Sequence, residues 1–155
     1  MKKITPFLWF DNQAEEAMNF YCSVFKNSKP GTIQRSADGP DGAVSSVTFQ
    51  LEGQDFMALN AGPTFKFNEA ISFFVDCKSQ QEVDELWSKL TADGGEESQC
   101  GWLKDRFGLS WQIIPTELGE MLGDKDPVKA QRAMQAMLKM RKIVIADLKK
   151  AYDGK

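Results

Sequence analysis

The chain has 155 residues, of which 42% are hydrophobic and 26% are charged, and its formal net charge is −3. This length and composition are typical of one globular domain, so we expect residues 1–155 to form a single domain. The acidic balance, without a run of Lys and Arg interleaved with exposed aromatic residues, argues against nucleic acid as a partner.

The first apolar stretch, residues 4–10, has the length of one strand, which is too short for a signal peptide core or a membrane span. The three cysteines, Cys22, Cys77 and Cys100, contain no CxxC pair. They therefore indicate neither a disulfide framework nor a zinc knuckle. We expect a cytoplasmic protein that does not enter a membrane.

The sequence contains no histidine. Imidazole is the commonest general base near neutral pH and the commonest side-chain ligand of transition metals. Its absence excludes Ser-His-Asp and Cys-His catalysis, HExxH zinc sites and the iron site built from two histidines and a carboxylate. No catalytic residue can be assigned from the sequence.

Residues 1–64 read as a first βαβββ module. Residues 4–10 alternate as a strand, and Asn12 with Glu15 resembles a capping box before an amphipathic helix. After the helix, the repeat of apolar residues changes from 3.6 residues to 2, which predicts strands over 31–36, 44–51 and 56–60. Turn residues at 38–42 and 52–55 separate these strands. The predicted apolar helix face consists of Met18, Tyr21, Cys22 and Phe25.

Residues 65–115 repeat this pattern, displaced by 65 positions, so that Asp76 corresponds to Asp11. A strand over 70–75 is followed by a capping box of Ser79 and Glu82. Strands over 101–104 and 109–114 follow the helix, and we interpret these residues as a second βαβββ module. The predicted apolar helix face consists of Val83, Leu86, Trp87 and Leu90.

Residues 116–153 form a predicted C-terminal helical extension. A short helix is expected over 116–122, ended by Gly123, and Asp126 followed by Pro127 is a strong start for another helix. The later apolar residues recur at helical spacing and predict one long amphipathic helix. We expect it to pack on its own sheet or across a homodimer. The apolar positions are Ala130, Ala133, Met134, Met137, Leu138, Ile145 and Leu148.

These stretches also carry a family resemblance. The segments ITPFLWFDNQAEEAMNFYCSVFKNS, ISFFVDCKSQQEVDELWSKL and WLKDRFGLSWQIIP, with the tail from 126 to 154, resemble the PhnB-like group of the glyoxalase, bleomycin-resistance and dioxygenase superfamily. The resemblance implies the vicinal-oxygen-chelate fold. This is an α+β fold in which two βαβββ modules form facing half-barrels, here followed by the helical extension. The pattern alone leaves a ferredoxin-like sandwich open.

The resembling group is sometimes labelled 3-demethylubiquinone-9 3-methyltransferase, and the sequence gives that activity little physical support. S-adenosylmethionine usually binds at a Gly-rich turn between a parallel strand and a helix. The two strand-to-helix junctions here contain Asp11-Asn12 and Asp76-Cys77 instead. We expect no cofactor.

The resemblance further implies four metal ligands, usually His and Glu, on four strands. The matching positions are Thr5, Asn60, Ala70 and Gln112. None of them is ionisable at neutral pH, and such a set is poor for a divalent metal. We therefore expect no metal site, with a displaced carboxylate such as Glu69 as the alternative.

Side chains that share a face with these positions suggest an aromatic cavity with neutral hydrogen-bonding groups, which suits a small, partly apolar ligand. The alternative is that these aromatics only fill the interior of a barrel. Trp111 should point the other way, into the core. The predicted ligand-binding residues are Thr5, Phe7, Trp9, Asn60, Ser72, Phe74, Trp102 and Gln112.

Two functions remain open at this point. One is metal-independent binding of a small molecule. The other is a superfamily enzyme, such as a lyase, isomerase or dioxygenase-like protein, that uses a displaced metal or a carboxylate among Glu52, Asp55 and Glu69. A purely structural dimer is compatible with the sequence but has no specific support.

Overall fold

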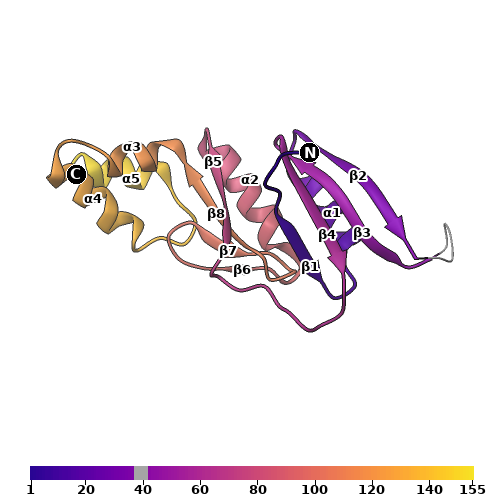
Figure 1. Ribbon diagram of the computed structural model, residues 1–155. Helices are drawn as coiled ribbons and strands as arrows, with labels where there is room; N and C mark the ends of the chain where they lie inside the picture. The colour runs from indigo at the N-terminus through magenta and orange to yellow at the C-terminus, as the bar shows by residue number, and fades with distance from the viewer. Residues whose placement is uncertain (37–41) are drawn as a thin grey trace. The chain divides into compact units, whose positions relative to one another are not determined.

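The computed structural model describes residues 1–36 and 42–155. Most of the turn predicted at 38–42 therefore lies outside the described residues. The chain divides into two compact units, Met1–Phe67 and Asn68–Lys155. Each unit contains one four-stranded sheet (Figure 1).

The first unit is a βαβββ module. Its sheet has the order β1-β4-β3-β2, in which β1 is parallel to β4 and the other pairs are antiparallel. A parallel pair requires a crossover connection, which α1 begins. The elements are β1 (Phe7–Phe10), α1 (Ala14–Val24), β2 (Ser28–Arg35), β3 (Val44–Leu51) and β4 (Gln54–Asn60).

The second unit repeats this topology with the order β5-β8-β7-β6, and again only the first pair is parallel. The internal repeat and the α+β class with two βαβββ modules are thus confirmed. The short β6 had no counterpart in the sequence prediction. The elements are β5 (Ser72–Cys77), α2 (Gln80–Thr91), η2 (Ala92–Gly94), β6 (Glu96–Glu97), β7 (Trp102–Lys104) and β8 (Ser110–Pro115).

Each helix buries its predicted apolar face, except that Cys22 of α1 is only partly buried. On α2, the four predicted residues Val83, Leu86, Trp87 and Leu90 are all buried. On α1, Met18 and Tyr21 are buried, and the Tyr21 ring lies 6.2 Å from that of Phe49 on β3. Alternate side chains of each strand therefore pack against the helix, and the others form the opposite face of the sheet.

The start of α1 differs from the sequence prediction. Asn12 does not cap this helix; Gln13 occupies the N-cap position and makes no side-chain cap bond. Instead, Asn60 at the end of β4 accepts a hydrogen bond from the Ala14 amide (2.8 Å) and donates one to the Val44 carbonyl (3.1 Å). The helix start is thus satisfied by a strand that lies far away in the sequence.

We expect Asn60→Ala to lower the free energy of unfolding by about 1–2 kcal/mol, because it removes the acceptor at the N-terminus of α1. Asn12→Ala is the matched control and should change stability by less than about 0.5 kcal/mol. Urea denaturation followed by circular dichroism measures both. A larger loss for Asn12→Ala would contradict this account of the cap.

The capping box predicted before α2 is present. The Ser79 hydroxyl accepts a hydrogen bond from the Glu82 amide (3.1 Å), and the Glu82 carboxylate accepts one from the Lys78 amide (2.7 Å). Both ends of this motif lie within five residues of each other, which is why the local sequence predicted it correctly.

The C-terminal extension consists of α3 (Thr116–Leu122), α4 (Pro127–Met137) and α5 (Ile145–Tyr152) (Figure 1). The predicted start at Asp126 is confirmed, since its side chain accepts hydrogen bonds from the Val128 and Lys129 amides. The prediction of one long helix is wrong, because the chain is not helical between α4 and α5.

Contacts with the second module explain this break. The amides of Cys100 and Gly101 donate to the carbonyls of Met140 and Arg141 (both 2.8 Å). The Gln80 side chain then accepts from the Ile145 amide (2.7 Å) and donates to the Ile143 carbonyl (3.0 Å). These bonds replace the helical ones that residues 140–145 would otherwise make, so two shorter helices result.

The extension has its own apolar cluster. Ile114, at the end of β8, packs with residues of all three helices. The predicted packing of the extension on its own sheet is therefore present in the second unit. The buried members of the cluster are Ile114, Leu118, Met121, Ala133, Ile143 and Leu148. Within the described part of the chain, no helix is long and apolar enough to cross a bilayer.

Candidate functional site

The sheet of the second unit presents a mixed aromatic and polar face on the side opposite α2. Trp111 is 3% exposed and its ring contacts Phe73 at 5.5 Å, so these two residues lie on the α2 side. Trp111 is a core residue, as predicted. Its neighbours along β8, Ser110 and Gln112, point to the opposite face because side chains alternate along a strand.

Strand register places three predicted ligand-binding residues in one row across this face. Gln112 on β8 pairs with Phe74 on β5 and with Trp102 on β7. An amide is thus flanked by two aromatic side chains, and Phe74 is 61% exposed. We call Phe74, Gln112 and Trp102 the aromatic row.

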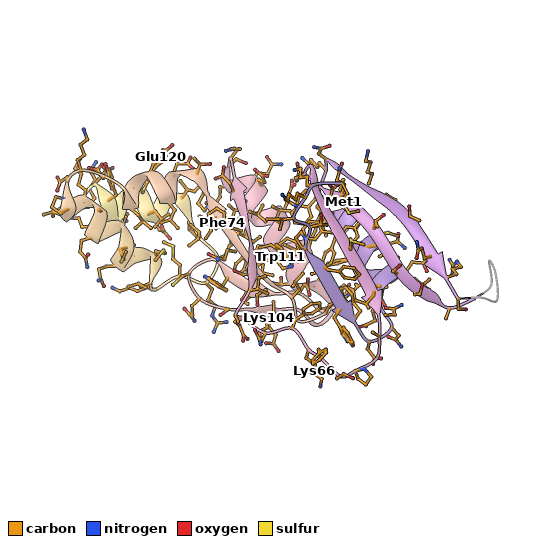
Figure 2. The ribbon with its side chains drawn as sticks, in the orientation of Figure 1. Met1, Lys66, Phe74, Lys104, Trp111 and Glu120 are labelled. Carbon is orange, nitrogen blue, oxygen red and sulfur yellow. The ribbon has the colours of Figure 1, made fainter. Side chains whose placement is uncertain are left out.

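A second row lies beside the first. Ser110 pairs with Ser72 and with Lys104. The Gln112 amide nitrogen donates to the Ser72 hydroxyl (2.9 Å), which ties the two rows together. We call Ser72, Ser110 and Lys104 the polar row. Phe74, Lys104 and Trp111 can be located on this sheet in Figure 2.

Ser110 has an unusual environment. It is 1% exposed, and its hydroxyl has no hydrogen-bond partner among the described residues. A buried hydroxyl without a partner costs about 1–3 kcal/mol. The polar row therefore contains a hydrogen-bonding group that a ligand or a water molecule would satisfy.

Lys104 is the charged member of this face. Its ammonium group forms an ion pair with the Glu69 carboxylate, which raises the pKa of Lys104 and lowers the pKa of Glu69 by a side-chain hydrogen bond. The sequence analysis missed Lys104. The signal was available, because Lys104 lies two residues after Trp102 on the same strand and must share its face.

The first unit carries a separate aromatic set. Phe7 and Trp9 on β1 point away from α1, and the Trp9 indole donates to the Gly62 carbonyl (2.9 Å). The Trp9 ring also meets the edge of Phe65 at 4.9 Å. Thr5 precedes β1, and its hydroxyl donates to the Lys2 carbonyl (2.9 Å).

Asn60 does not share the face of Trp9, so this part of the predicted constellation is wrong. Trp9 pairs with Leu59, and Asn60 pairs with Phe10, which is buried on the α1 side. Ala58, two residues before Asn60 on the same strand, is also buried on that side. The matched position lies one residue away from those that face away from α1, and a shift of one residue reverses every side chain of a strand.

The residues at the expected metal positions do not fit a metal ion. Asn60 bonds to α1 and β3, Ala70 offers a methyl group, and Thr5 and Gln112 offer neutral oxygens. Hard divalent cations are held mainly by carboxylates with carbonyl oxygens and water, and zinc by thiolate, imidazole or carboxylate, and this set contains no anionic or imidazole ligand. Across residues 1–36 and 42–155, no group of three or more His, Cys, Asp or Glu could hold a metal ion.

The alternative carboxylates are occupied by protein partners. Glu69 pairs with Lys104, and Glu52 accepts from the Asn27 amide (3.2 Å). Asp55 accepts from Gln50 (2.8 Å) and from the Lys2 amide (2.9 Å), and these bonds lower the pKa of Asp55. These interactions leave no cluster of carboxylates for acid–base work.

The strand-to-helix junctions also do not fit S-adenosylmethionine. Neither junction contains glycine, and their helix N-termini are already bonded to Asn60 and Ser79. Each sheet has a single parallel pair rather than the parallel sheet of nucleotide-binding folds.

Cys77 is not a nucleophile at neutral pH. It is fully buried, and burial raises the pKa of its thiol to about 12. The thiolate is the reactive form, so this cysteine acts as a small core residue. Burial also raises the pKa of Cys22.

Two βαβββ units with one helix on each sheet define the vicinal-oxygen-chelate class, to which glyoxalase and bleomycin-resistance proteins belong. The family model described as 3-demethylubiquinone-9 3-methyltransferase matches residues 2–114. The chain belongs to this family, and the methyltransferase wording is the family's name. No curated protein matches the sequence.

Solved structures support the same assignment. A PhnB protein from Bacillus cereus with the same methyltransferase description is 36% identical, with a TM-score of 0.68 over 74% of this chain and 100% of its own. Protein PA1353 from Pseudomonas aeruginosa (20% identity, TM-score 0.60, 74% and 98% coverage) shares the fold. The fosfomycin resistance protein FosX from Listeria monocytogenes shares the fold as well, with 14% identity and a TM-score of 0.55 over 77% of this chain and 97% of its own.

Proposed function

We propose that this protein binds a small, planar and partly apolar ligand without a metal, on the face formed by the aromatic row and the polar row. The observation that carries the proposal is the pairing of Gln112 with Phe74 on one side and Trp102 on the other. Aromatic side chains around a few fixed polar groups are typical of small-molecule sites.

The polar groups support recognition by hydrogen bonding. The Gln112 amide is held by Ser72, and the buried Ser110 hydroxyl has an unused hydrogen-bonding capacity. A ligand with a carbonyl or hydroxyl group would complete these contacts and restore the free energy that the unpaired hydroxyl costs. Lys104 lies in the same row, so an anionic substituent on the ligand would compete with Glu69 for it.

Binding is favoured over catalysis by the chemistry of the same residues. The chain has no histidine, its nearby carboxylates are paired, and Cys77 is protonated. A general acid or base needs a titratable group with a pKa near the working pH. Thr5, Phe7 and Trp9 of the first unit stay predicted ligand-binding residues, separate from the sheet face of this proposal.

Phe74→Ala and Trp102→Ala are each expected to weaken binding about tenfold or more, because each removes one aromatic surface that the ligand would stack on. The probe is anilinonaphthalene sulfonate, a planar dye with one anionic group, titrated by fluorescence. Leu138→Ala is the control, since Leu138 is an exposed apolar residue (50%) outside the sheets.

Unchanged dye affinity in both sheet variants would overturn the proposed site. Native mass spectrometry of protein purified without chelator is the second measurement. A metal ion on each chain together with turnover of a substrate would replace the proposal with the enzyme alternative. An unexplained small-molecule mass that is absent from Trp102→Ala would support binding and supply the ligand.

The native mass spectrum also tests the proposed homodimer. A homodimer is part of this proposal because the C-terminal extension is predicted to pack on its own sheet or across a dimer. The cytoplasm is the proposed location. The three cysteines are free thiols, which is in keeping with a reducing compartment.

A further inference from the structure

Charge is distributed very unevenly along this chain. Residues 125–155 carry nine Lys or Arg and three Asp or Glu, which gives a net charge of +6. Residues 1–124 carry ten Lys or Arg and nineteen Asp or Glu, which gives a net charge of −9. The basic segment contains α4 and α5, and both lie beyond residues 2–114, the part that the family model matches.

A groove runs along α4 and α5. Its volume is about 910 Å³. Apolar side chains of Val128, Ala136, Met140 and Ala151 line it, together with the cations Arg132 and Lys139. The lining residues of α4 recur at intervals of three and four, so they form one continuous stripe of the helix.

Several of the side chains that line the groove are exposed to solvent. Val128 is 57% exposed, and Arg132 and Lys139 are exposed as well. The buried side of α4 is instead the one that carries Ala133, which packs in the apolar cluster of the extension. Ala136 and Met140 are partly buried against the same cluster. Val128, Arg132 and Lys139 stay exposed, so the groove presents apolar and cationic surface together.

We propose that this groove binds an acidic amphipathic helix of a partner protein. The apolar face of such a helix would cover Val128 and Met140, and its carboxylates would lie against Arg132 and Lys139. This is the helix-in-groove mode of recognition, with opposite charges that increase the association rate and select the partner. The inference does not depend on the ligand proposed for the sheet face.

The alternatives fit the groove less well. A second copy that used the same surface would place two basic grooves against each other, which costs free energy. Nucleic acid would find no aromatic side chain among the groove residues for base stacking. An anionic membrane would find no aromatic anchor among these lining residues.

The first test is a fluorescence anisotropy titration of the full chain with a labelled acidic amphipathic helical peptide of about 15 residues. We expect binding that weakens at high salt. Arg132→Glu combined with Lys139→Glu should weaken it at least about tenfold. The matched control is Lys26→Glu with Lys29→Glu, which changes the net charge equally in the first unit and should have less than about a twofold effect.

The second test concerns the apolar part of the groove. Val128→Ser should weaken peptide binding several-fold, whereas Leu138→Ser should not, because Leu138 is equally exposed near the end of α4 but does not line the groove. Circular dichroism melting of every variant shows that the fold is intact. If both charge-reversed pairs bind the peptide equally well, the proposal is wrong.

Other partners are separate outcomes. Tighter binding to phosphatidylserine vesicles or to duplex DNA than to the peptide would overturn the proposal. So would self-association in sedimentation velocity that Arg132→Glu with Lys139→Glu abolishes. Dye binding to the sheet face is measured on the same variants and should not change, so the two proposals fail independently.

Discussion

Replacing Asp105 with Ala is expected to lower the free energy of unfolding by about 3 kcal/mol or more. Asp105 is 2% exposed and sits at the turn between β7 and β8. Its carboxylate accepts hydrogen bonds from the amides of Phe107 (2.9 Å) and Leu109 (3.1 Å) and from the Trp111 indole (2.9 Å). Alanine would leave these buried donors without an acceptor.

Two further substitutions make the test specific. Asp105→Asn keeps an oxygen for the two backbone amides but presents an amide group to the Trp111 indole, so an intermediate loss is expected. Asp11→Ala is the control, because Asp11 is an exposed acid that directly follows a strand, β1, of the first unit. Urea denaturation followed by circular dichroism gives all three values. A loss below about 1 kcal/mol for Asp105→Ala would contradict this role.

Gly101→Val is expected to cost about 3 kcal/mol or more, for two separate reasons. Gly101 has φ +85, a left-handed conformation that is strained for any other residue. A Cβ atom there would also lie 2.6 Å from a methyl carbon of Ile114 and 3.2 Å from Ile143. Overpacking of this kind typically costs about 1–3 kcal/mol beyond the backbone strain.

Gly108→Val separates these two contributions. Gly108 has φ +89, but nothing lies within 4 Å of a Cβ atom built there. Gly108→Val should therefore lower the free energy of unfolding only by the cost of backbone strain, about 1–2 kcal/mol. Urea denaturation measures the difference, and limited proteolysis should show earlier cleavage around residues 138–144 in Gly101→Val. Equal losses in the two variants would mean that the contact with Ile114 and Ile143 is unimportant.

The experiments on Asp105 and Gly101 concern the two places where the second module is tied together. Asp105 fixes the turn that brings Trp102 and Lys104 of β7 beside Gln112 and Ser110 of β8. Gly101, in the loop before β7, allows that loop to approach the chain between α4 and α5. Damage at either position should therefore also affect the aromatic row or the groove.

Part of the candidate site could be predicted from the sequence. Ser72, Phe74, Trp102 and Gln112 share one face because each was placed by counting alternate residues along a strand whose position was correct. Asn60 was assigned to the wrong face because the matched position in β4 was one residue away from those that share the face of Trp9. Register is set by contacts across the sheet, and the sequence of a single strand does not contain it.

The sequence by itself determined the features whose signal is local. Helix periodicity, the Ser79 and Asp126 caps and the repeat of two βαβββ modules all depend on residues a few positions apart. Tertiary structure alone decided the features that join distant residues. Asn60 caps α1 from β4, and the loop at 100–101 interrupts the predicted long helix. In each case the free energy comes from a hydrogen bond or contact formed only after the chain has folded, so no local pattern could predict it.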